Sequence, residues 1–326
     1  MTKDRLLALL KQNSGQLLSG GAAAKELSVS RNAVWKAICS LKEDGFLINT
    51  VPNKGYLYHG HDDSVLSAEE LRSFLSEGKI GGRILTYSSV TSTNTEARKL
   101  AEEGAPDGTV VWADYQSEGK GRREHSFYSP AGAGIYMSVI LRPQANLSMI
   151  HPLFIRVSLA VTAAIRDICG LDVQVKWPND IFWRGKKLCG ILTNCSVSAE
   201  DGLLEYAVAG IGVNVKAVLF PKGIPAVSLE EAVQGPVSRH KLAASILEEI
   251  DRFYQKHGLE ELSMEEIACY EKQMEQNGRN AIINYPDGGK AAGRVLGISP
   301  EGFLQIQTSC GTVSLRSGEA AVQVVE

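Results

Sequence analysis

This 326-residue sequence lacks the features that define several large classes of protein. No apolar run approaches the length of a membrane span, and the first residues lack the apolar region of a signal peptide, so we expect a cytoplasmic protein without membrane contact. The six cysteines are scattered, with no Cys-x-x-Cys pair or His-rich tract, which disfavours disulfides and zinc sites. A dinucleotide fingerprint is absent because Glu124 stands at its third glycine, and a P-loop is absent because Gly121 follows the Gly-Lys pair.

The charges that are present are distributed unevenly. From Met1 to Tyr58 the chain has eight basic and four acidic residues, a net charge of +4, which leaves −7 for the rest of a total of −3. A basic segment in an otherwise acidic chain indicates a polyanion as partner. The length allows two or three domains, at least one of them with a sizeable core.

Residues 1–62 are predicted to form a winged helix-turn-helix domain. Helices are expected over 4–12 and 22–27, separated by a break at Gly20-Gly21, and a third is expected after a capping Ser30. Two strands over 46–58, around the turn Asn53-Lys54-Gly55, would form the wing. Residues 59–63 are expected to be a polar linker, in which His59 and His61 form a solvated hinge rather than a metal site.

Four residues lie on the exposed side of the second helix of this motif, where bases or phosphates can be met: Arg31, Asn32, Trp35 and Lys36. The alternative is a solvated helix face. Helix order, wing and local positive charge together favour DNA binding.

The pattern from residue 67 to 276 alternates helices with strands, and the overall class predicted is α/β (α+β) with a central mixed sheet. One hairpin is expected to turn at Arg184-Gly185, and a helix over 94–103 is expected to be capped by Thr93 or Asn94. Short strands with Gly and Pro turns over 281–325 predict a small β-barrel. The predicted domains are therefore 1–62, 63–276 and 277–326.

One basic loop, from Gly119 to Pro130, combines the groups needed to bind a ligand that is part anion and part apolar ring. Its glycines allow close approach of backbone amides to an anion. Positive charge would come from Lys120, Arg122, Arg123 and His125, and an apolar wall from Phe127 and Tyr128. A solvated basic surface loop is an equally weighted reading of this stretch alone.

Two further segments carry candidate chemistry. In Lys-Trp-Pro-Asn-Asp, Pro178 fixes a turn that presents Asn179 and Asp180, although such residues are also ordinary in turns. The aspartate could orient an amine or act as a base. Lys187 enters an apolar strand beside small residues, where burial is costly unless an anion meets the ammonium group, so we expect it to bind a ligand.

Four motifs occur in order: the basic glycine loop, Lys-Trp-Pro-Asn-Asp, Lys-Leu-x-Gly-Ile-Leu and Gly-Ile-Gly-x-Asn-Val. With a winged helix before them and a small barrel after them, the whole chain closely resembles the bacterial family of bifunctional biotin protein ligases and biotin operon repressors. The resemblance implies that biotin and ATP form biotinyl-5′-AMP, and that the acyl group then passes to a lysine of biotin carboxyl carrier protein. It also implies an SH3-like C-terminal barrel.

The resemblance also implies roles for individual residues. The ureido ring of biotin would be held by Ser92, Thr93, Asn94 and Gln116. The adenylate loop would comprise Gly119, Lys120, Gly121, Arg122, Arg123 and Phe127, with Arg122 at the mixed anhydride. Lys187 would hold the carboxylate and the α-phosphate, Asp180 would receive the carrier lysine, and Asn214 would lie near adenine, with Asn179 and Gly190 completing the set. The catalytic roles fall to Lys187, Arg122 and Asp180.

Magnesium is expected to arrive with ATP and to be held mainly by phosphates, without a dedicated metal site. Our hypothesis is a protein with two roles, in which biotinyl-5′-AMP is the corepressor. When the adenylate is not consumed, the ordered loop would favour a homodimer that places two winged helices on palindromic operator DNA. The loop departs from the family pattern at Lys120, Glu124 and His125, which stand for Arg, Gly and Arg. Glu124 adds negative charge, so weaker adenylate retention or a remodelled loop is expected.

Two other functions share some of these features. A regulator that senses a small molecule without chemistry would have the winged helix and the pocket but would not need Lys187 and Asp180. A ligase acting on lipoate would share the fold, but the domain order and Lys-Trp-Pro-Asn-Asp favour biotin.

Overall fold

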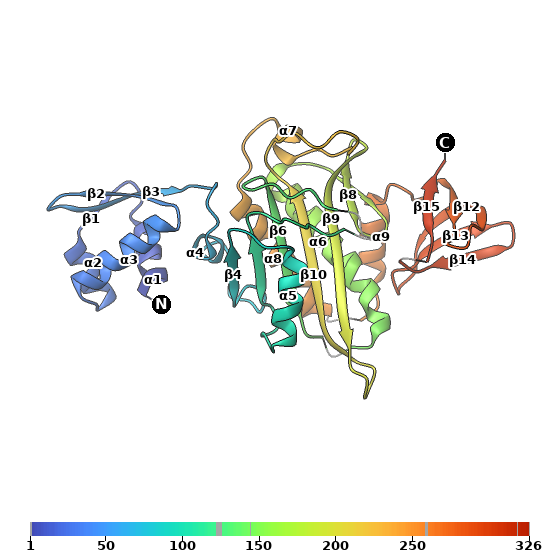
Figure 1. Ribbon diagram of the computed structural model, residues 1–326, viewed down its shortest axis with the longest axis horizontal. Coiled ribbons are helices and arrows are strands. Elements are labelled where there is room, and N and C mark those ends of the chain that lie inside the picture. Colours follow the sequence, from blue (N-terminus) through green and yellow to red (C-terminus); the bar gives the residue numbers. More distant parts are fainter. Residues whose placement is uncertain (1, 122–125, 144, 258–259, 318, 326) are drawn as a thin grey trace.

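The computed structural model describes residues 2–121, 126–143, 145–257, 260–317 and 319–325. Three groups of elements follow one another along the longest axis: an N-terminal helical group with a hairpin, a large central sheet with its helices, and a C-terminal sheet (Figure 1). This arrangement confirms the predicted fold class. The boundaries at 62 and 276 stay predictions.

The N-terminal group is a winged helix-turn-helix. Its elements are α1 (Thr2–Gln12), β1 (Leu17–Leu18), α2 (Gly20–Leu27), α3 (Arg31–Glu43), β2 (Phe46–Val51) and β3 (Gly55–His61). Ser30 caps α3 by accepting the amide of Ala33 at 3.1 Å, and the predicted apolar residues Val34, Ile38 and Leu41 are buried. The wing turn contains Asn53 at a φ of 59°, a conformation that asparagine tolerates better than most residues.

Two predictions for this group were wrong. Gly20 and Gly21 do not break the chain but begin α2, because Ser19 caps the helix by accepting the amide of Ala22. His61 is not in a solvated hinge. It lies in β3, packs edge-on against the ring of His240 at 4.7 Å between centroids, and burial lowers the pKa of its imidazole.

The central part is a seven-stranded mixed sheet with the order β4-β5-β6-β10-β9-β8-β7. Its strands are β4 (Ile84–Tyr87), β5 (Val110–Ala113), β6 (Gly134–Leu141), β7 (Gln174–Lys176), β8 (Asp180–Trp183), β9 (Lys186–Val197) and β10 (Leu204–Asn214). Only β4 and β5 pair in parallel; the remaining neighbours are antiparallel. The predicted hairpin turn is confirmed, with Arg184 and Gly185 both at positive φ between β8 and β9.

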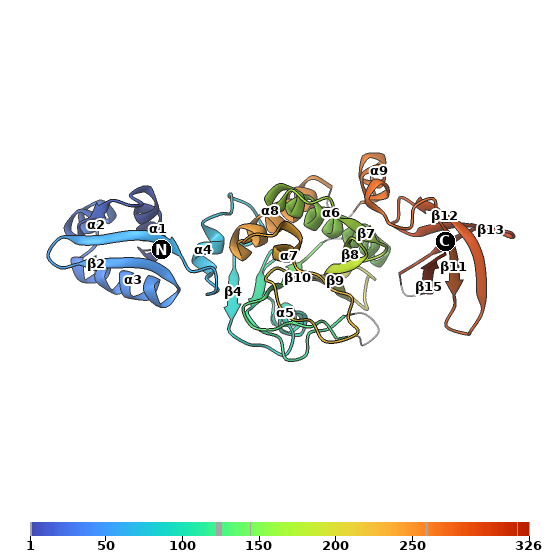
Figure 2. The same ribbon diagram turned by 90° about the horizontal axis from the view of Figure 1, so that it is seen from above.

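Helices cover the two faces of this sheet unequally. They are α4 (Ala68–Arg72), α5 (Thr93–Glu102), α6 (Ile150–Cys169, after a 3₁₀ turn Leu147–Met149), α7 (Leu229–Val233), α8 (Arg239–His257) and α9 (Met264–Gln273). The long helices α6 and α8 cover one face, whereas α5 lies against the other (Figure 2). The second face is therefore covered by α5 over β5, β6 and β10 and is available for a site over β9, β8 and β7.

The helix α6 corrects the prediction about apolar runs. The segment Leu147–Cys169 has a mean hydropathy of 1.6 and is long and apolar enough to cross a membrane. However, 72% of its apolar window is buried inside the protein, where it packs on the sheet and on α8. Its composition is that of a core helix.

The C-terminal part is a five-stranded antiparallel sheet with the order β14-β13-β12-β11-β15. Its strands are β11 (Asn280–Asn284), β12 (Lys290–Ile298), β13 (Leu304–Thr308), β14 (Gly311–Leu315) and β15 (Ala321–Val324). An irregularity between Val295 and Gly297 interrupts the register of β12 with β13 and bends the sheet there. One apolar cluster joins this sheet to Trp177 and to two residues of α6, Ile155 and Leu159, so the sheet packs directly on the central part.

Candidate active site

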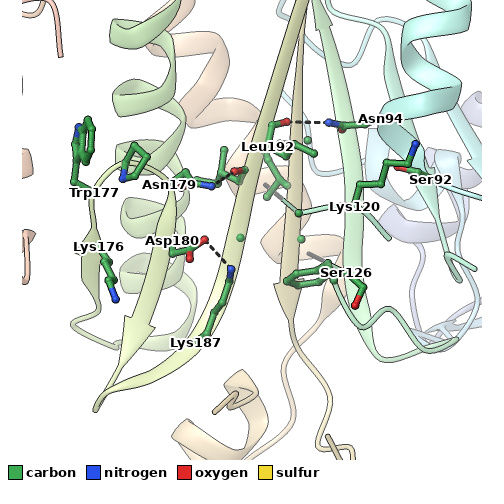
Figure 3. Close-up of a pocket in the computed structure, with 18 of the residues that line it drawn as sticks. Ser92, Asn94, Lys120, Ser126, Lys176, Trp177, Asn179, Asp180, Lys187 and Leu192 are labelled. Atoms are coloured by element: carbon green, nitrogen blue, oxygen red, sulfur yellow. Dashed lines mark hydrogen bonds and ion pairs between the residues drawn. The ribbon is translucent and has the colours of Figure 1, made fainter. Parts of the chain in front are cut away.

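A cavity of about 260 Å³ opens on the α5 side of the central sheet. The start of α5, the loop that begins at Gly119 and strands of the central sheet contribute to its wall (Figure 3). The beginning of β15 contributes as well. Eleven of the predicted site residues line it: Ser92, Thr93, Asn94, Gln116, Lys120, Gly121, Phe127, Asn179, Asp180, Lys187 and Gly190. Residues that are far apart in sequence therefore meet at one place.

One end of the cavity is a buried network of neutral polar groups. Gln116 accepts both the backbone N–H and the hydroxyl of Thr93, at 2.9 and 3.1 Å. The hydroxyl of Ser138 donates to Asn94 Oδ1 at 2.6 Å, and Asn94 Nδ2 donates to the carbonyl of Leu192 at 2.9 Å. The hydroxyl of Ser92 lines the cavity without a hydrogen bond to any described residue. This end can therefore hydrogen-bond a neutral polar ring.

The predicted cap of α5 was wrong for a reason that concerns this network. The helix begins at Thr93 after Ser92, so Thr93 and Asn94 are inside its first turn and not at its cap. Their side chains turn toward the cavity and the neighbouring strands instead of capping the helix.

Three glycines on β9 and β10 make room for the side chains that line the cavity. A Cβ on Gly210 would lie 1.9 Å from Asn94 Oδ1, and one on Gly212 would lie 2.7 Å from the ring of Phe127. Gly190 faces both Lys187 and Phe127, with nearest atoms at 3.2 and 3.5 Å from an added Cβ. The absence of side chains at these glycines leaves the space that Asn94 and Phe127 occupy.

The other end of the cavity carries charge. Lys187 Nζ lies 2.7 Å from Asp180 Oδ1, across the pair β8–β9, and both side chains remain about one-third exposed at 33% and 28% (Figure 3). The anion expected beside Lys187 is therefore, in part, the carboxylate of Asp180. Lys176, on β7, adds a second ammonium group to this end; its Nζ lies 5.5 Å from the centroid of the Phe182 ring.

The backbone of Lys187 is held on both sides. Its N–H donates to Pro225, its carbonyl accepts from Val227, and Asn214 Nδ2 donates to the same carbonyl at 3.3 Å. Asn214 is 7% exposed and lies outside the described lining of the cavity. In this structure it supports Lys187, and its contact with adenine stays a prediction.

The neighbouring Cys189 is fully buried on the opposite face of β9. Burial raises the pKa of its thiol far above the ordinary value, against the opposing effect of the Lys187 charge. The thiol is therefore neutral and unreactive at neutral pH. Within the charged end, Lys187 and Asp180 remain the groups that can act on a ligand.

The glycine loop returns on itself before it reaches the cavity. Phe127 N donates to Gly119 O at 2.7 Å, and Lys120 pairs with Ser126, so the two ends of the loop are joined. This turn leaves no room for a side chain at position 119, because a Cβ on Gly119 would lie 2.3 Å from the carbonyl oxygen of Phe127. Gly119 faces the loop itself and is not part of the described cavity lining.

The two aromatic residues of the loop do not act together as predicted. Phe127 lines the cavity and packs edge-on against Tyr136. Tyr128 instead packs against Phe220, away from the described lining, and is 40% exposed. Arg122, Arg123 and His125 lie outside the described residues, so their roles stay predictions.

Several residues at the site were not found from the sequence. Ser138, Ser129 and Asn194 complete the hydrogen bonds of the neutral end. A serine inside the apolar strand 134–141 was a usable signal for Ser138. Nothing in the sequence pointed to Ala320, Ala321 and Val322, which line the cavity because the C-terminal sheet lies beside it.

The predicted DNA-contacting face is exposed. Arg31, Asn32, Trp35 and Lys36 all lie on the solvent side of α3, and 55% of Trp35 is accessible. Lys54, at the tip of the wing, is exposed too. A large exposed aromatic between basic residues suits contact with a nucleic acid better than an ordinary solvated face.

Comparisons with known proteins agree with this fold. Residues 86–214 match the model of the biotin/lipoate A/B protein ligase family, and residues 2–57 match that of an HTH domain. The solved biotin protein ligase from Aquifex aeolicus, in complex with biotin and ATP, aligns with a TM-score of 0.62 at 26% identity, over 75% of this chain and 100% of that one. The class defined is a protein ligase domain preceded by a DNA-binding domain.

Full-length relatives narrow the class. The bifunctional ligase/repressor BirA of Bacillus subtilis is 33% identical over 98% of both chains, and that of Escherichia coli is 28% identical over 97% of both. The chain therefore belongs to the family of bifunctional biotin ligase/repressor proteins. This result confirms the resemblance read from the four motifs.

Proposed function

We propose that this protein joins biotin to ATP and then to a carrier protein, and that it also represses transcription with the intermediate as corepressor. In the first step a biotin carboxylate oxygen attacks the α-phosphorus, and the bond to the β-phosphate breaks, releasing pyrophosphate. In the second step a carrier lysine amine attacks the acyl carbon of biotinyl-5′-AMP and loses a proton, and AMP leaves. The observation that carries the proposal is one cavity with a neutral hydrogen-bonding end and a charged end that holds the Lys187–Asp180 pair.

The neutral end suits the ureido ring of biotin. A ureido group has N–H donors and a carbonyl acceptor, which match the amide and hydroxyl groups of Asn94, Thr93, Gln116 and Ser92. The dithiolane ring of lipoate offers none of these groups. Binding it here would leave the Ser92 hydroxyl without a partner and would gain no hydrogen bond from the other polar groups of this end, which disfavours lipoate.

The charged end suits the first chemical step. Carboxylate and triphosphate repel each other, and a held ammonium group offsets that repulsion as negative charge develops. Two observations support this role for Lys187: its backbone is held by hydrogen bonds on both sides, and its side chain lines the cavity. Arg122 is assigned the same task at the mixed anhydride, by analogy with the family's loop.

The second step requires a neutral amine at the acyl carbon. Asp180 is positioned to accept a hydrogen bond from the incoming ammonium group and to take its proton, since one of its oxygens already binds the ammonium group of Lys187. Exchange of one ammonium partner for another would bring the carrier lysine into the cavity.

Magnesium would accompany the nucleotide. Asp180 is the single carboxylate among the described residues that line the cavity, and the described chain has no group of three His, Cys, Asp or Glu residues suited to a metal. This donor set fits an ion held mainly by phosphates, which is how Mg²⁺ commonly binds with nucleotides. Its chemistry would be to neutralise the triphosphate.

The enzymatic proposal is tested by mass spectrometry of a biotin carboxyl carrier domain incubated with the protein, ATP and Mg²⁺. Biotin should add one biotinyl group to one lysine, with AMP and pyrophosphate as products. Lipoate in place of biotin should give no product. Modification by lipoate alone would support the lipoate alternative, and no modification by either would support the non-catalytic regulator.

For the second role, the adenylate is proposed to favour a homodimer that binds palindromic operator DNA, in the cytoplasm. Contacts would be made by Arg31, Asn32, Trp35 and Lys36 on α3. Sedimentation should show dimers with biotinyl-5′-AMP and monomers without it. On DNA from its own biotin genes, Lys36→Ala should reduce the salt slope by about one unit, whereas Lys290→Ala, in the C-terminal sheet, should leave it unchanged.

A further inference from the structure

One buried side chain outside the cavity holds the turn that carries Asp180. Gln276 is 1% exposed and follows α9 in the segment that leads to β11. Its Oε1 accepts the backbone N–H of Trp177 at 2.8 Å, and its Nε2 donates to the carbonyl of the same residue at 3.3 Å. Two such bonds to one residue reproduce the pairing between opposed residues of antiparallel strands.

The same turn has further contacts with the C-terminal part. The indole N–H of Trp177 donates to the carbonyl of Gly302 at 3.2 Å, and the ring is buried in the apolar cluster that includes Ile283 and Val295. The backbone N–H of Glu275 donates to Val175 at 2.9 Å. The strand before the turn is thus fixed to the start of the C-terminal sheet.

On its other side the turn is fixed to β9. Asn179 Nδ2 donates to the carbonyl of Ile191 at 2.6 Å, and Ile191 N–H donates to Asn179 O at 2.9 Å. Asp180 follows directly and pairs with Lys187. The position of the carboxylate relative to the ammonium group therefore depends on two supports, Ile191 inside the sheet and Gln276 at the junction.

We propose that Gln276 is a positioning residue for the transfer step: through Trp177 it sets Asp180 against Lys187 and makes the C-terminal sheet part of the machinery that receives the carrier lysine. This inference rests on the proposed function. Without the amide, the buried N–H and C=O of Trp177 lose their partners, and the turn relaxes away from the sheet. A displacement of about 1 Å at a reacting group can cost about 100-fold in rate.

The test compares two variants with a matched control in both half-reactions. Gln276→Ala should lower kcat for transfer from preformed biotinyl-5′-AMP to the carrier domain by about 10- to 100-fold, with the Kd for biotin unchanged within about twofold. Asn277→Ala removes the neighbouring, exposed amide, which bonds only Glu271 O among the described residues. It should leave both quantities unchanged.

The Gln276→Glu variant adds a second measurement, the pH dependence of the transfer rate, which a purely structural role would leave unchanged. Its carboxylate still accepts from Trp177 N–H but faces the Trp177 carbonyl with an oxygen in place of a donor. Burial raises the pKa of such a group, and protonation restores the donor. The ratio of variant to wild-type transfer rates should therefore rise as pH falls.

The outcomes separate the two proposals. If wild-type protein makes neither adenylate nor product, the proposed function fails. If the wild type is active but Gln276→Ala transfers at the same rate, or loses biotin affinity in parallel, the positioning role is overturned. Should Gln276→Ala fail to fold, the pH ratio of Gln276→Glu decides, and a flat ratio overturns the role.

Discussion

The two ends of the cavity are built in different ways. At the neutral end Thr93, Asn94 and Gln116 are at most 9% exposed and are joined by hydrogen bonds to one another or to the sheet. The charged end carries Lys176 and the Lys187–Asp180 ion pair, in which about one-third of each side chain is in contact with solvent. Groups held by several buried hydrogen bonds are already in place, whereas on the proposed function Lys187 and Asp180 would exchange partners when the ligand binds.

This difference indicates which end of the cavity should set the selectivity for the ligand and which should set the reaction rate. On the proposed function, the neutral end should favour a ring with donors and acceptors over one that lacks them, because only the former can hydrogen-bond the groups that face the cavity. A solvated ion pair contributes little by itself and becomes effective once the ligand excludes water. The neutral end should therefore determine affinity for biotin, and the charged end should determine the rate of adenylate formation.

The largest effect is expected on the rate of adenylate formation when the ammonium group of Lys187 is removed. Lys187→Ala should lower adenylate formation by about 100- to 1000-fold, because the developing charge loses its fixed donor. Pyrophosphate release measures this step, and Lys186→Ala changes the adjacent, exposed lysine as a control. Unchanged pyrophosphate release in a folded Lys187→Ala protein would contradict the assigned role.

A methyl group at position 210 should disrupt the neutral end of the cavity. The added Cβ of Gly210→Ala would meet Asn94 Oδ1 at 1.9 Å, so Asn94 must move out of its hydrogen bonds. We expect biotin affinity to fall by about 10- to 100-fold, the cost of breaking one or two buried bonds, with ATP affinity nearly unchanged. Calorimetry measures both.

Gly235→Ala is the matched control, because an added Cβ there has nothing nearer than 4.0 Å. Equal losses of biotin and ATP affinity in Gly210→Ala would show that the two ends are not independent.

A smaller change tests the support of Asn94. Ser138→Ala removes the hydroxyl that donates to Asn94 Oδ1, so we expect about a 5- to 10-fold increase in the Kd for biotin. Ser314→Ala, an exposed serine on β14, should have no effect. If Ser138→Ala binds biotin as the wild type does, Asn94 is held sufficiently by Leu192 and Asn194 alone.

The smallest effect should come from salt. From about 0.1 M to about 1 M sodium chloride the screening length falls from about 10 Å to about 3 Å. The KM for ATP should rise severalfold, because the charged end is solvated, and the Kd for biotin should change less than about twofold. Equal salt dependence of the two constants would remove the contrast between the ends.

Local patterns pointed to Lys187, Asn179 and Asp180, which line the cavity, whereas Ser92, Thr93, Asn94 and Gln116 were named only through the family resemblance. Lys187 beside Gly190, and Asn179-Asp180 after Pro178, lie in single hairpins, so local pattern was sufficient for them. The partners of Asn94 come from β6 and β9, and sequence alone does not determine which strands become neighbours. The winged helix was predicted well because its caps and apolar spacing are local, whereas His61 was misread because its partner, His240, is distant in the chain.

The role of Gln276 shows the same limit. Nothing in the sequence around it indicates function, since its effect depends on Trp177, which reaches it only through tertiary packing. The prediction that Tyr128 forms one wall with Phe127 was wrong for the opposite reason. The two residues are adjacent in sequence, but consecutive side chains of an extended segment point in opposite directions, and Tyr128 packs against Phe220.

The most direct test is a crystal structure of the protein soaked with biotin, ATP and Mg²⁺. We predict biotinyl-5′-AMP in the cavity, its ureido ring bonded to Asn94 and Gln116 and its phosphate within hydrogen-bond distance of Lys187 Nζ. A ligand in the reverse orientation, or one that leaves the Lys187–Asp180 pair untouched, would contradict the division of the cavity into a neutral end and a charged end.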